Sequence, residues 1–140
     1  EVNFEGEDGM SWKEILKGKS GIAYSAIVLD DASREKLLAL DIPDGWKPYG
    51  HHMTIRMGSL KDDSQYTVGE KVNLNMTGVG MSDKAMAVTV DGVREDGKFF
   101  PHITVAVSPD GKPFNSNQIP QENFEDFSGT LTGTVQEVPQ

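Results

Sequence analysis

Alternation of apolar and polar residues with a period of two is the feature that most restricts the fold of this 140-residue chain. A period of two places successive side chains on opposite faces of an extended strand and is typical of half-buried antiparallel sheets. A further segment, 21–31 (GIAYSAIVLDD), is rich in small and β-branched residues, which predicts a largely buried strand. The alternation runs through 51–58 (HHMTIRMG), 70–80 (EKVNLNMTGVG), 84–93 (KAMAVTVDGV), 101–108 (PHITVAVS) and 129–138 (GTLTGTVQEV).

Helices are fewer than strands and are predicted from their start signals. A capping box at 11–14 (SWKE) predicts a short helix over WKEILK, which Gly18 ends. The pair Asp30–Asp31 is able to cap a second helix over 32–40 (ASREKLLAL). We expect loops over 59–68 and 108–120, and a short helical turn near 121–127. The predicted fold class is therefore α+β with mostly antiparallel sheets.

Chain length favours one domain, because 140 residues with 36% hydrophobic content can bury one core but not two ordinary ones. The acidic, glycine-containing residues 1–10 are predicted to be a flexible segment or tag, and 11–140 a single domain. No stretch of 18 apolar residues occurs, so we expect no membrane contact and a soluble protein, with the cytoplasm as the default location.

Composition limits the chemistry of the protein. With no cysteine, disulfides, thiolate zinc sites and cysteine nucleophiles are excluded. A net charge of −9 argues against a protein that binds long nucleic acid through its phosphate backbone. A small or short anionic substrate is still compatible with this charge. Three histidines in two places, without an HExxH motif, give little reason to expect a metal, and we predict no cofactor.

Two of the alternating segments carry a histidine two residues before a threonine. On a strand, His52 and Thr54 share one face, as do His102 and Thr104, while the apolar residues between them face the core. Such paired side chains are able to reach one ligand across a groove. The alternative is that these residues have no function, because the solvent-exposed face of a strand commonly carries His and Thr.

Paired His-x-Thr motifs, with these flanks, resemble the two-histidine (2H) phosphoesterase superfamily. That superfamily includes bacterial RNA 2′,3′-cyclic phosphodiesterases of the LigT type, the cyclic phosphodiesterase domains of tRNA ligases, and phage enzymes that destroy cyclic oligonucleotide signals. YSAIVLDDASREKLLAL with GWKPYGHHMTIRMG is similar to the strand, helix and first motif strand of these proteins, and FPHITVAV to the second. The resemblance implies a two-lobed fold, with antiparallel sheets forming a central groove and helices on the flanks.

The resemblance also implies metal-independent catalysis, in which His52 and His102 act as general acid and base. Histidine suits both roles because its ordinary pKa of about 6.5 makes either form accessible near neutral pH. Thr54 and Thr104 would donate hydrogen bonds to the nonbridging phosphate oxygens. His51 is predicted to point to the opposite face and to be structural.

Four further residues are candidates for substrate binding, each with a structural alternative. Arg56 is predicted to share the catalytic face and to hold a phosphate, or else to form a rim ion pair. Tyr24 is a candidate for stacking on a base or for a hydrogen bond to the phosphate, or else belongs to the core. Trp46 and Tyr49, in the loop before His52, would form a stacking wall, or else pack in the core or within that loop.

Two functions from different classes follow. The first is a phosphodiesterase acting on a 2′,3′-cyclic phosphate, a 2′-5′ or 3′-5′ linkage, or a short or cyclic oligonucleotide. Small size and acidity favour a freestanding nucleotide hydrolase, including a viral antagonist of nucleotide signalling, over a tRNA-processing enzyme. The second is a noncatalytic domain that binds a nucleotide or a protein partner on the same scaffold.

Overall fold

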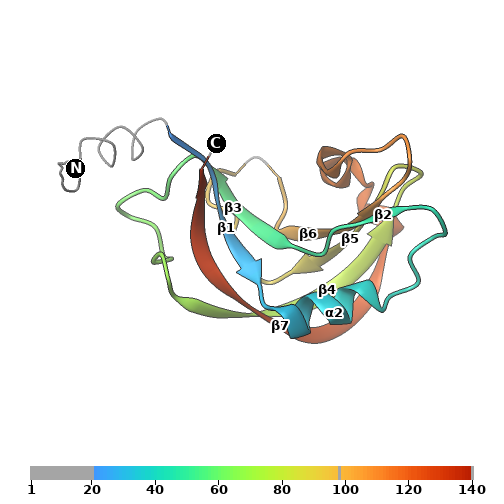
Figure 1. The fold of residues 1–140 in the computed structure, drawn as a ribbon, viewed down its shortest axis with the longest axis horizontal. Helices are drawn as coiled ribbons and strands as arrows, with labels where there is room; N and C mark the ends of the chain where they lie inside the picture. The colour runs from blue at the N-terminus through green and yellow to red at the C-terminus, as the bar shows by residue number, and fades with distance from the viewer. Residues whose placement is uncertain (1–20, 98, 140) are drawn as a thin grey trace.

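A single antiparallel sheet forms the body of the protein. The computed structural model describes residues 21–97 and 99–139, and its strands lie in the spatial order β2-β6-β3-β1-β7-β4-β5 (Figure 1). β5 also pairs with β6, so six of the strands close into a barrel and β2 extends one edge of β6. The strands are β1 (Ile22–Leu29), β2 (Lys47–Pro48), β3 (His52–Met57), β4 (Lys71–Met81), β5 (Ala85–Val90), β6 (His102–Val107) and β7 (Phe124–Pro139).

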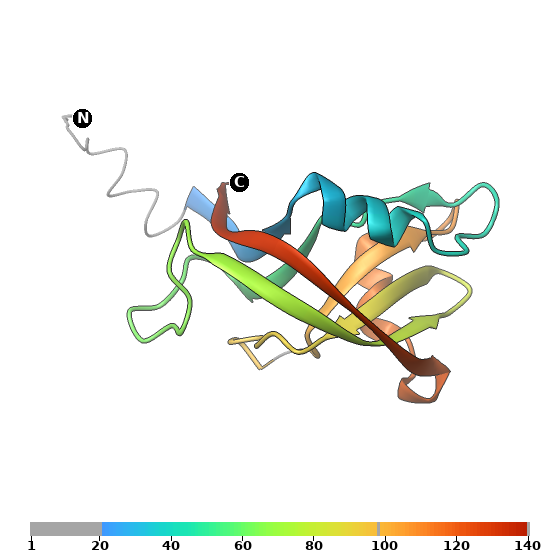
Figure 2. The same cartoon turned by 90° about the horizontal axis from the view of Figure 1, so that it is seen from below.

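The predicted strands and the antiparallel class are confirmed, whereas the two separate lobes are not found, and α2 (Asp31–Leu38) is the one α-helix in the described residues. The reason is the length of β4 and β7, which pair along most of their course and connect both ends of the sheet (Figure 2). Barrel closure by β5 and β6 then leaves no open groove between two sheets. The helix predicted over 12–17 and the segment 1–10 lie outside the described residues.

The apolar face of each strand points into the barrel. Alternation places Met53 and Ile55 of β3 inside with Ile103 and Val105 of β6, and all four are fully buried. The barrel therefore has a continuous core, which continues through side chains from the other strands: Ile27, Leu74, Val88, Leu131 and Val135.

The helix α2 (Asp31–Leu38) forms where the Asp pair predicts it. Asp30 is the N-cap, and its carboxylate accepts a hydrogen bond from the Ser33 backbone N–H at 2.8 Å. This bond lowers the pKa of Asp30 below its ordinary value. Ser33 Oγ in turn accepts the Thr132 backbone N–H at 2.7 Å, which fixes the helix against β7. α2 thereby sets the path of the chain toward β3.

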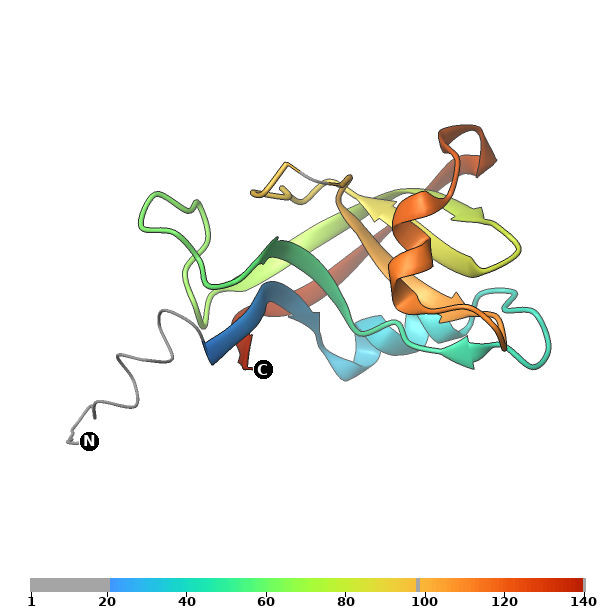
Figure 3. The ribbon, with the colours of Figure 1, turned by 90° about the horizontal axis from the view of Figure 1, so that it is seen from above.

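Two short 3-10 helices follow β6. The helix η3 (Gln121–Asn123) corresponds to the predicted helical turn near residue 121. The helix η2 (Pro113–Gln118) lies within the segment predicted as a loop, and it packs across β6 and β5 (Figure 3). No helix in the described part of the chain is long and apolar enough to cross a membrane.

Glycine at position 133 permits close packing of β7 on β1. A Cβ atom there would lie 2.7 Å from the Val28 carbonyl oxygen and 2.8 Å from Ile27 Cγ2. We predict that Gly133→Ala lowers the free energy of unfolding by about 1 to 3 kcal/mol, because a methyl group is forced into a filled space. Urea denaturation measures this change. Gln136→Ala, at an exposed position of the same strand, is the control, and equal stability of the two variants would contradict the packing described here.

Candidate functional site

The register between β3 and β6 brings the two His-x-Thr motifs together. Met53 lies directly opposite Ile103, and both side chains enter the core. Residues opposite each other in an antiparallel pair share a face, and their neighbours occupy the other face. The neighbours are His52, Thr54, His102 and Thr104, so all four emerge on the outer side of the barrel wall.

These four side chains line one cavity of about 720 Å³. Its volume lies within the range of about 300 to 1,000 Å³ that is typical of small-ligand sites. The remaining lining residues come from β1, the β2–β3 connection, the last residue of β3, the β5–β6 connection and η2: Tyr24, Tyr49, His51, Met57, Arg94, Phe99, Pro113, Phe114, Ser116 and Asn117.

His102 is held by hydrogen bonds at both ring nitrogens. Nδ1 lies 2.7 Å from the Phe100 carbonyl oxygen, which can only accept, so Nδ1 carries a proton and donates it. Nε2 lies 3.0 Å from Ser116 Oγ. Burial lowers the pKa of His102, and the Arg94 charge lowers it further, while the hydrogen bond to Phe100 acts in the opposite direction. The neutral ring therefore carries its lone pair on Nε2, facing the cavity.

Ser116 is a site residue that sequence reasoning missed. It is 1% exposed, and its Oγ contacts Thr104 Oγ1 at 2.7 Å as well as His102 Nε2 and the Pro113 carbonyl oxygen at 2.7 Å. One hydroxyl proton cannot serve both Pro113 and a neutral His102. While His102 is neutral, Ser116 therefore donates to only one of the two acceptors at a time. When His102 is protonated, Nε2 donates to Ser116 and the Ser116 proton goes to Pro113, so both contacts are satisfied. Nothing in the Pro/Gly/Asn-rich segment signals this contact.

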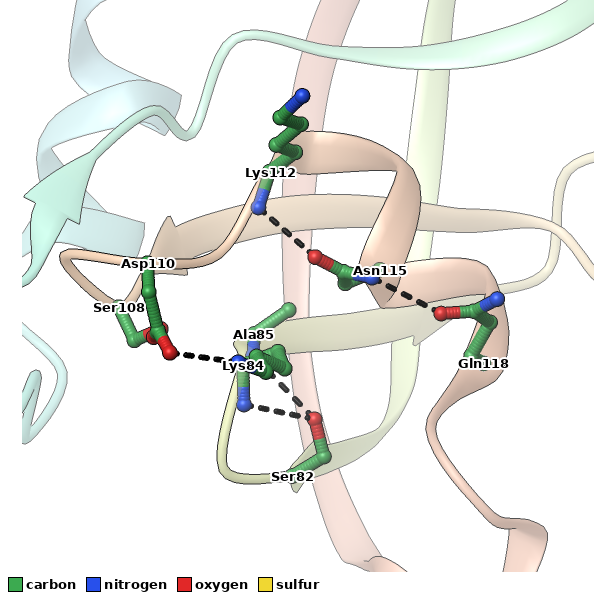
Figure 4. Close-up of polar contacts among 8 residues, drawn as sticks. All are labelled: Ser82, Lys84, Ala85, Ser108, Asp110, Lys112, Asn115 and Gln118. Atoms are coloured by element: carbon green, nitrogen blue, oxygen red, sulfur yellow. Dashed lines mark hydrogen bonds and ion pairs between the residues drawn. The ribbon is translucent and has the colours of Figure 1, made fainter.

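A polar network fixes the segment that carries Ser116 (Figure 4). Ser108 Oγ donates to Asp110 at 2.8 Å, and Lys84 Nζ binds the other carboxylate oxygen of Asp110 at 2.6 Å. Past this turn, Asn115 accepts the Lys112 backbone N–H and donates to Gln118, both at 2.8 to 2.9 Å. The β4–β5 turn and η2 are therefore each tied to their surroundings beside the second motif.

His52 lies in a different environment, between aromatic rings. Tyr24 stacks on it with ring centroids 4.9 Å apart and planes 23° from parallel. Its Nδ1 is 3.0 Å from Nδ1 of His51, so one imidazole donates to the other. Burial lowers the pKa of His52 to about 4, and the neighbouring His51 and His102 contribute to the decrease. His52 is therefore neutral at pH 7 in the free protein.

The placement of His51 corrects our prediction that it points to the opposite face. β3 begins only at His52, and the preceding Gly50 has a left-handed backbone with φ of +58°. Strand alternation therefore does not extend to His51, and its ring reaches the cavity beside His52.

Arg56 is the second departure from strand alternation. Ser25 of β1 pairs with Arg56 and Ala26 pairs with Thr54, so Ile55 is an extra residue at a β-bulge. After the bulge, Met57 lines the cavity and Arg56 does not. Arg56 Nη1 instead donates to the Ser59 carbonyl oxygen at 2.6 Å. The predicted placement of Arg56 on the catalytic face is therefore wrong.

The aromatic candidates divide between site and core. Tyr24 and Tyr49 line the cavity, where a substrate contact would have to lie. Trp46 packs against the main core and is not among the residues that line the cavity, so its structural alternative applies. Phe99, Phe114 and Arg94 line the cavity without having been predicted, because they lie in connections with no strand periodicity.

Comparison with known proteins gives one family. The model of the fungal tRNA ligase phosphodiesterase domain matches residues 31–138. The chain belongs to this family. The family is part of the 2H phosphoesterase superfamily, which confirms the resemblance carried by the His-x-Thr motifs, and it consists of cyclic phosphodiesterases. Neither a search of curated proteins nor a search of solved structures gave a match.

Membership in this family establishes a phosphodiesterase of the cyclic type. Within residues 21–97 and 99–139, no group of three or more His, Asp or Glu side chains is arranged to hold a metal ion.

The lowered pKa of His52 predicts a pH dependence of stability. An unfolded histidine binds its proton near pH 6.5, whereas folded His52 binds one only near pH 4. Between these values the unfolded chain holds more protons, so the free energy of unfolding should decrease as the pH falls from 6.5 to 4. Urea denaturation at several pH values, compared with His52→Gln, isolates this contribution. An identical slope in both proteins would contradict the buried, neutral state of His52.

Proposed function

We propose that this protein hydrolyses a 2′,3′-cyclic phosphate at an RNA end, using His52 and His102 as its proton carriers. The observation that carries the proposal is the meeting of both His-x-Thr motifs in one cavity, through the β3–β6 register. Two imidazoles on a shared wall are able to act on the attacking and the leaving oxygen of one phosphate. The family of cyclic phosphodiesterases supports the same reaction.

The reaction balances with one water molecule. One imidazole takes a proton from water as the water oxygen forms its bond to phosphorus. The other, protonated, imidazole gives its proton to the ribose oxygen whose bond to phosphorus breaks. A ring-opened phosphomonoester leaves, and the pair of histidines returns to its starting protonation state after proton exchange.

The hydroxyls of Thr54 and Thr104 serve as donors to the nonbridging oxygens in this proposal. In the free protein, Ser116 Oγ takes the place of such an oxygen, because it contacts both Thr104 Oγ1 and His102 Nε2. A bound phosphate would replace these two contacts, while Ser116 keeps its bond to the Pro113 carbonyl. Donors that are already aimed at the phosphate position need little rearrangement in the transition state.

Local charge makes the cavity suitable for an anion despite the net charge of −9. None of the residues that line it is acidic, and Arg94, whose charge Asp96 balances, has N–H groups that can donate to an anion. The substrate in this proposal is the end of an RNA or a short oligonucleotide, so few phosphates have to approach the acidic surface.

Removal of either histidine should abolish the reaction. We predict that His52→Ala and His102→Ala each lower kcat by about 100- to 10,000-fold, because a proton transfer is lost. Phosphorus NMR with 2′,3′-cyclic AMP in EDTA measures turnover and identifies the phosphomonoester formed, and binding of 2′-AMP or 3′-AMP shows that each variant retains its site. Binding without turnover by the unaltered protein would support the noncatalytic alternative. A requirement for added metal would contradict the proposed mechanism.

The pH profile should reflect the lowered pKa values of both imidazoles. One histidine must be charged and the other neutral, so kcat/KM should be bell-shaped. Since the pKa of His52 is about 4 and that of His102 is also lowered, its maximum should lie below pH 6.5. A bound phosphate anion favours the imidazolium form, so kcat should peak at a higher pH than kcat/KM. Initial rates from pH 4 to 9 measure both profiles, and a flat profile would exclude the pair of histidines as proton carriers.

A further inference from the structure

The cavity has a second aromatic wall that the proposed chemistry does not use. Phe114 of η2 is 57% exposed, unusually open for a phenylalanine, and its ring lies edge-on to Phe99 with centroids 5.7 Å apart. Both rings line the cavity. Large apolar side chains that remain exposed in a concave site are typical of a binding surface.

Arg94 completes this wall. Its guanidinium lies over the Phe99 ring, 5.4 Å from the centroid, and Asp96 holds it through two hydrogen bonds of 2.9 and 3.1 Å. The Arg94 side chain is only 7% exposed, yet the residue lines the cavity. A fixed, planar guanidinium with further N–H groups is well suited to bind a phosphate beside a stacked ring.

The strand order places Tyr24 and Phe114 on opposite sides of the two His-x-Thr motifs. Across the barrel surface, β1 carries Tyr24, β3 and β6 carry the His-x-Thr motifs, and η2 packs over β6 and β5 on the far side. Tyr24 therefore flanks the phosphate position through β1, and Phe114 flanks it through η2. A cavity of about 720 Å³ extends along both flanks.

We propose that Arg94, Phe99 and Phe114 form a second-nucleotide subsite. The subsite binds the nucleotide adjoining the one that bears the cyclic phosphate. Its base stacks on the exposed ring of Phe114, which Phe99 supports edge-on, and the phosphate that links the two nucleotides lies against Arg94. The preferred substrate is then an oligonucleotide end of at least two nucleotides. This inference rests on the proposed function, since it extends the same site.

A comparison of two substrates tests the subsite. We expect kcat/KM for the dinucleotide ApA with a terminal 2′,3′-cyclic phosphate to exceed that for 2′,3′-cyclic AMP by about tenfold or more, as stacking of one additional base provides. Phe114→Ala should lower this ratio severalfold, because the stacking contribution is lost while the contact with Arg94 stays, and Phe114→Tyr should retain the full ratio. Val68→Ala, which shortens an exposed apolar side chain outside the cavity, is the matched control and should leave the ratio unchanged.

The role of Arg94 is tested by changing the substrate and not the protein, because replacing Arg94 would also break its ion pair with the buried Asp96. Replacing the linking phosphate of the dinucleotide by a neutral methylphosphonate should lower kcat/KM severalfold in the unaltered protein. Equal kcat/KM for the mononucleotide and the dinucleotide would overturn the subsite and leave the proposed function intact. A ratio that persists in Phe114→Ala, or full activity on the methylphosphonate, would also overturn it. Turnover of neither substrate would instead overturn the proposed function.

Discussion

The pairing of Met53 with Ile103 is the contact on which the site depends. These two side chains are fully buried, and they lock β3 against β6 in one register within the closed barrel. A slip by one residue would exchange the faces of a strand, bringing its histidine and threonine into the core. The cost of burying those polar groups without partners opposes the slip. Packing inside the barrel therefore determines the geometry of the chemistry on its outer wall.

The same packing explains why the two imidazoles are neutral in the free protein. Both rings lie against aromatic neighbours, His52 on Tyr24 and His102 on Phe100 with centroids 4.6 Å apart. Burial favours the uncharged form, which lowers both pKa values. The hydrogen bonds at His102 favour its charged form, through the donation to the Phe100 carbonyl and the contact with Ser116. An arriving phosphate anion adds to this preference, so the substrate itself helps to provide the protonated partner that acid catalysis needs.

The sequence predicts those elements and site residues that follow from local periodicity. The prediction is wrong for residues at which the backbone departs from regular strand geometry. The strands, the capped helix at Asp30 and the shared face of each His-x-Thr pair follow from alternation or start signals. The bulge at Ile55 turned Arg56 out of the cavity, and the left-handed Gly50 turned His51 toward it. Ser116 reaches His102 from a short 3-10 helix with no apolar repeat. Closure of the barrel also needs β1 to pair with β7, more than 90 residues further along the chain, and no single segment encodes such a nonlocal pairing.

Net charge illustrates the difference between a global and a local property. An acidic protein repels a long polyanion, and the salt dependence of nucleic-acid binding grows with the number of phosphates that it contacts. A cavity that accepts one cyclic phosphate, and in our proposal one linking phosphate, contacts few charges. Its lining contains no carboxylate, and Asp96 balances the charge of Arg94, so the cavity lacks the negative charge that the protein carries on average. In our proposal, recognition of an RNA end therefore needs no basic patch, because stacking on aromatic rings, which is insensitive to charge, provides the affinity.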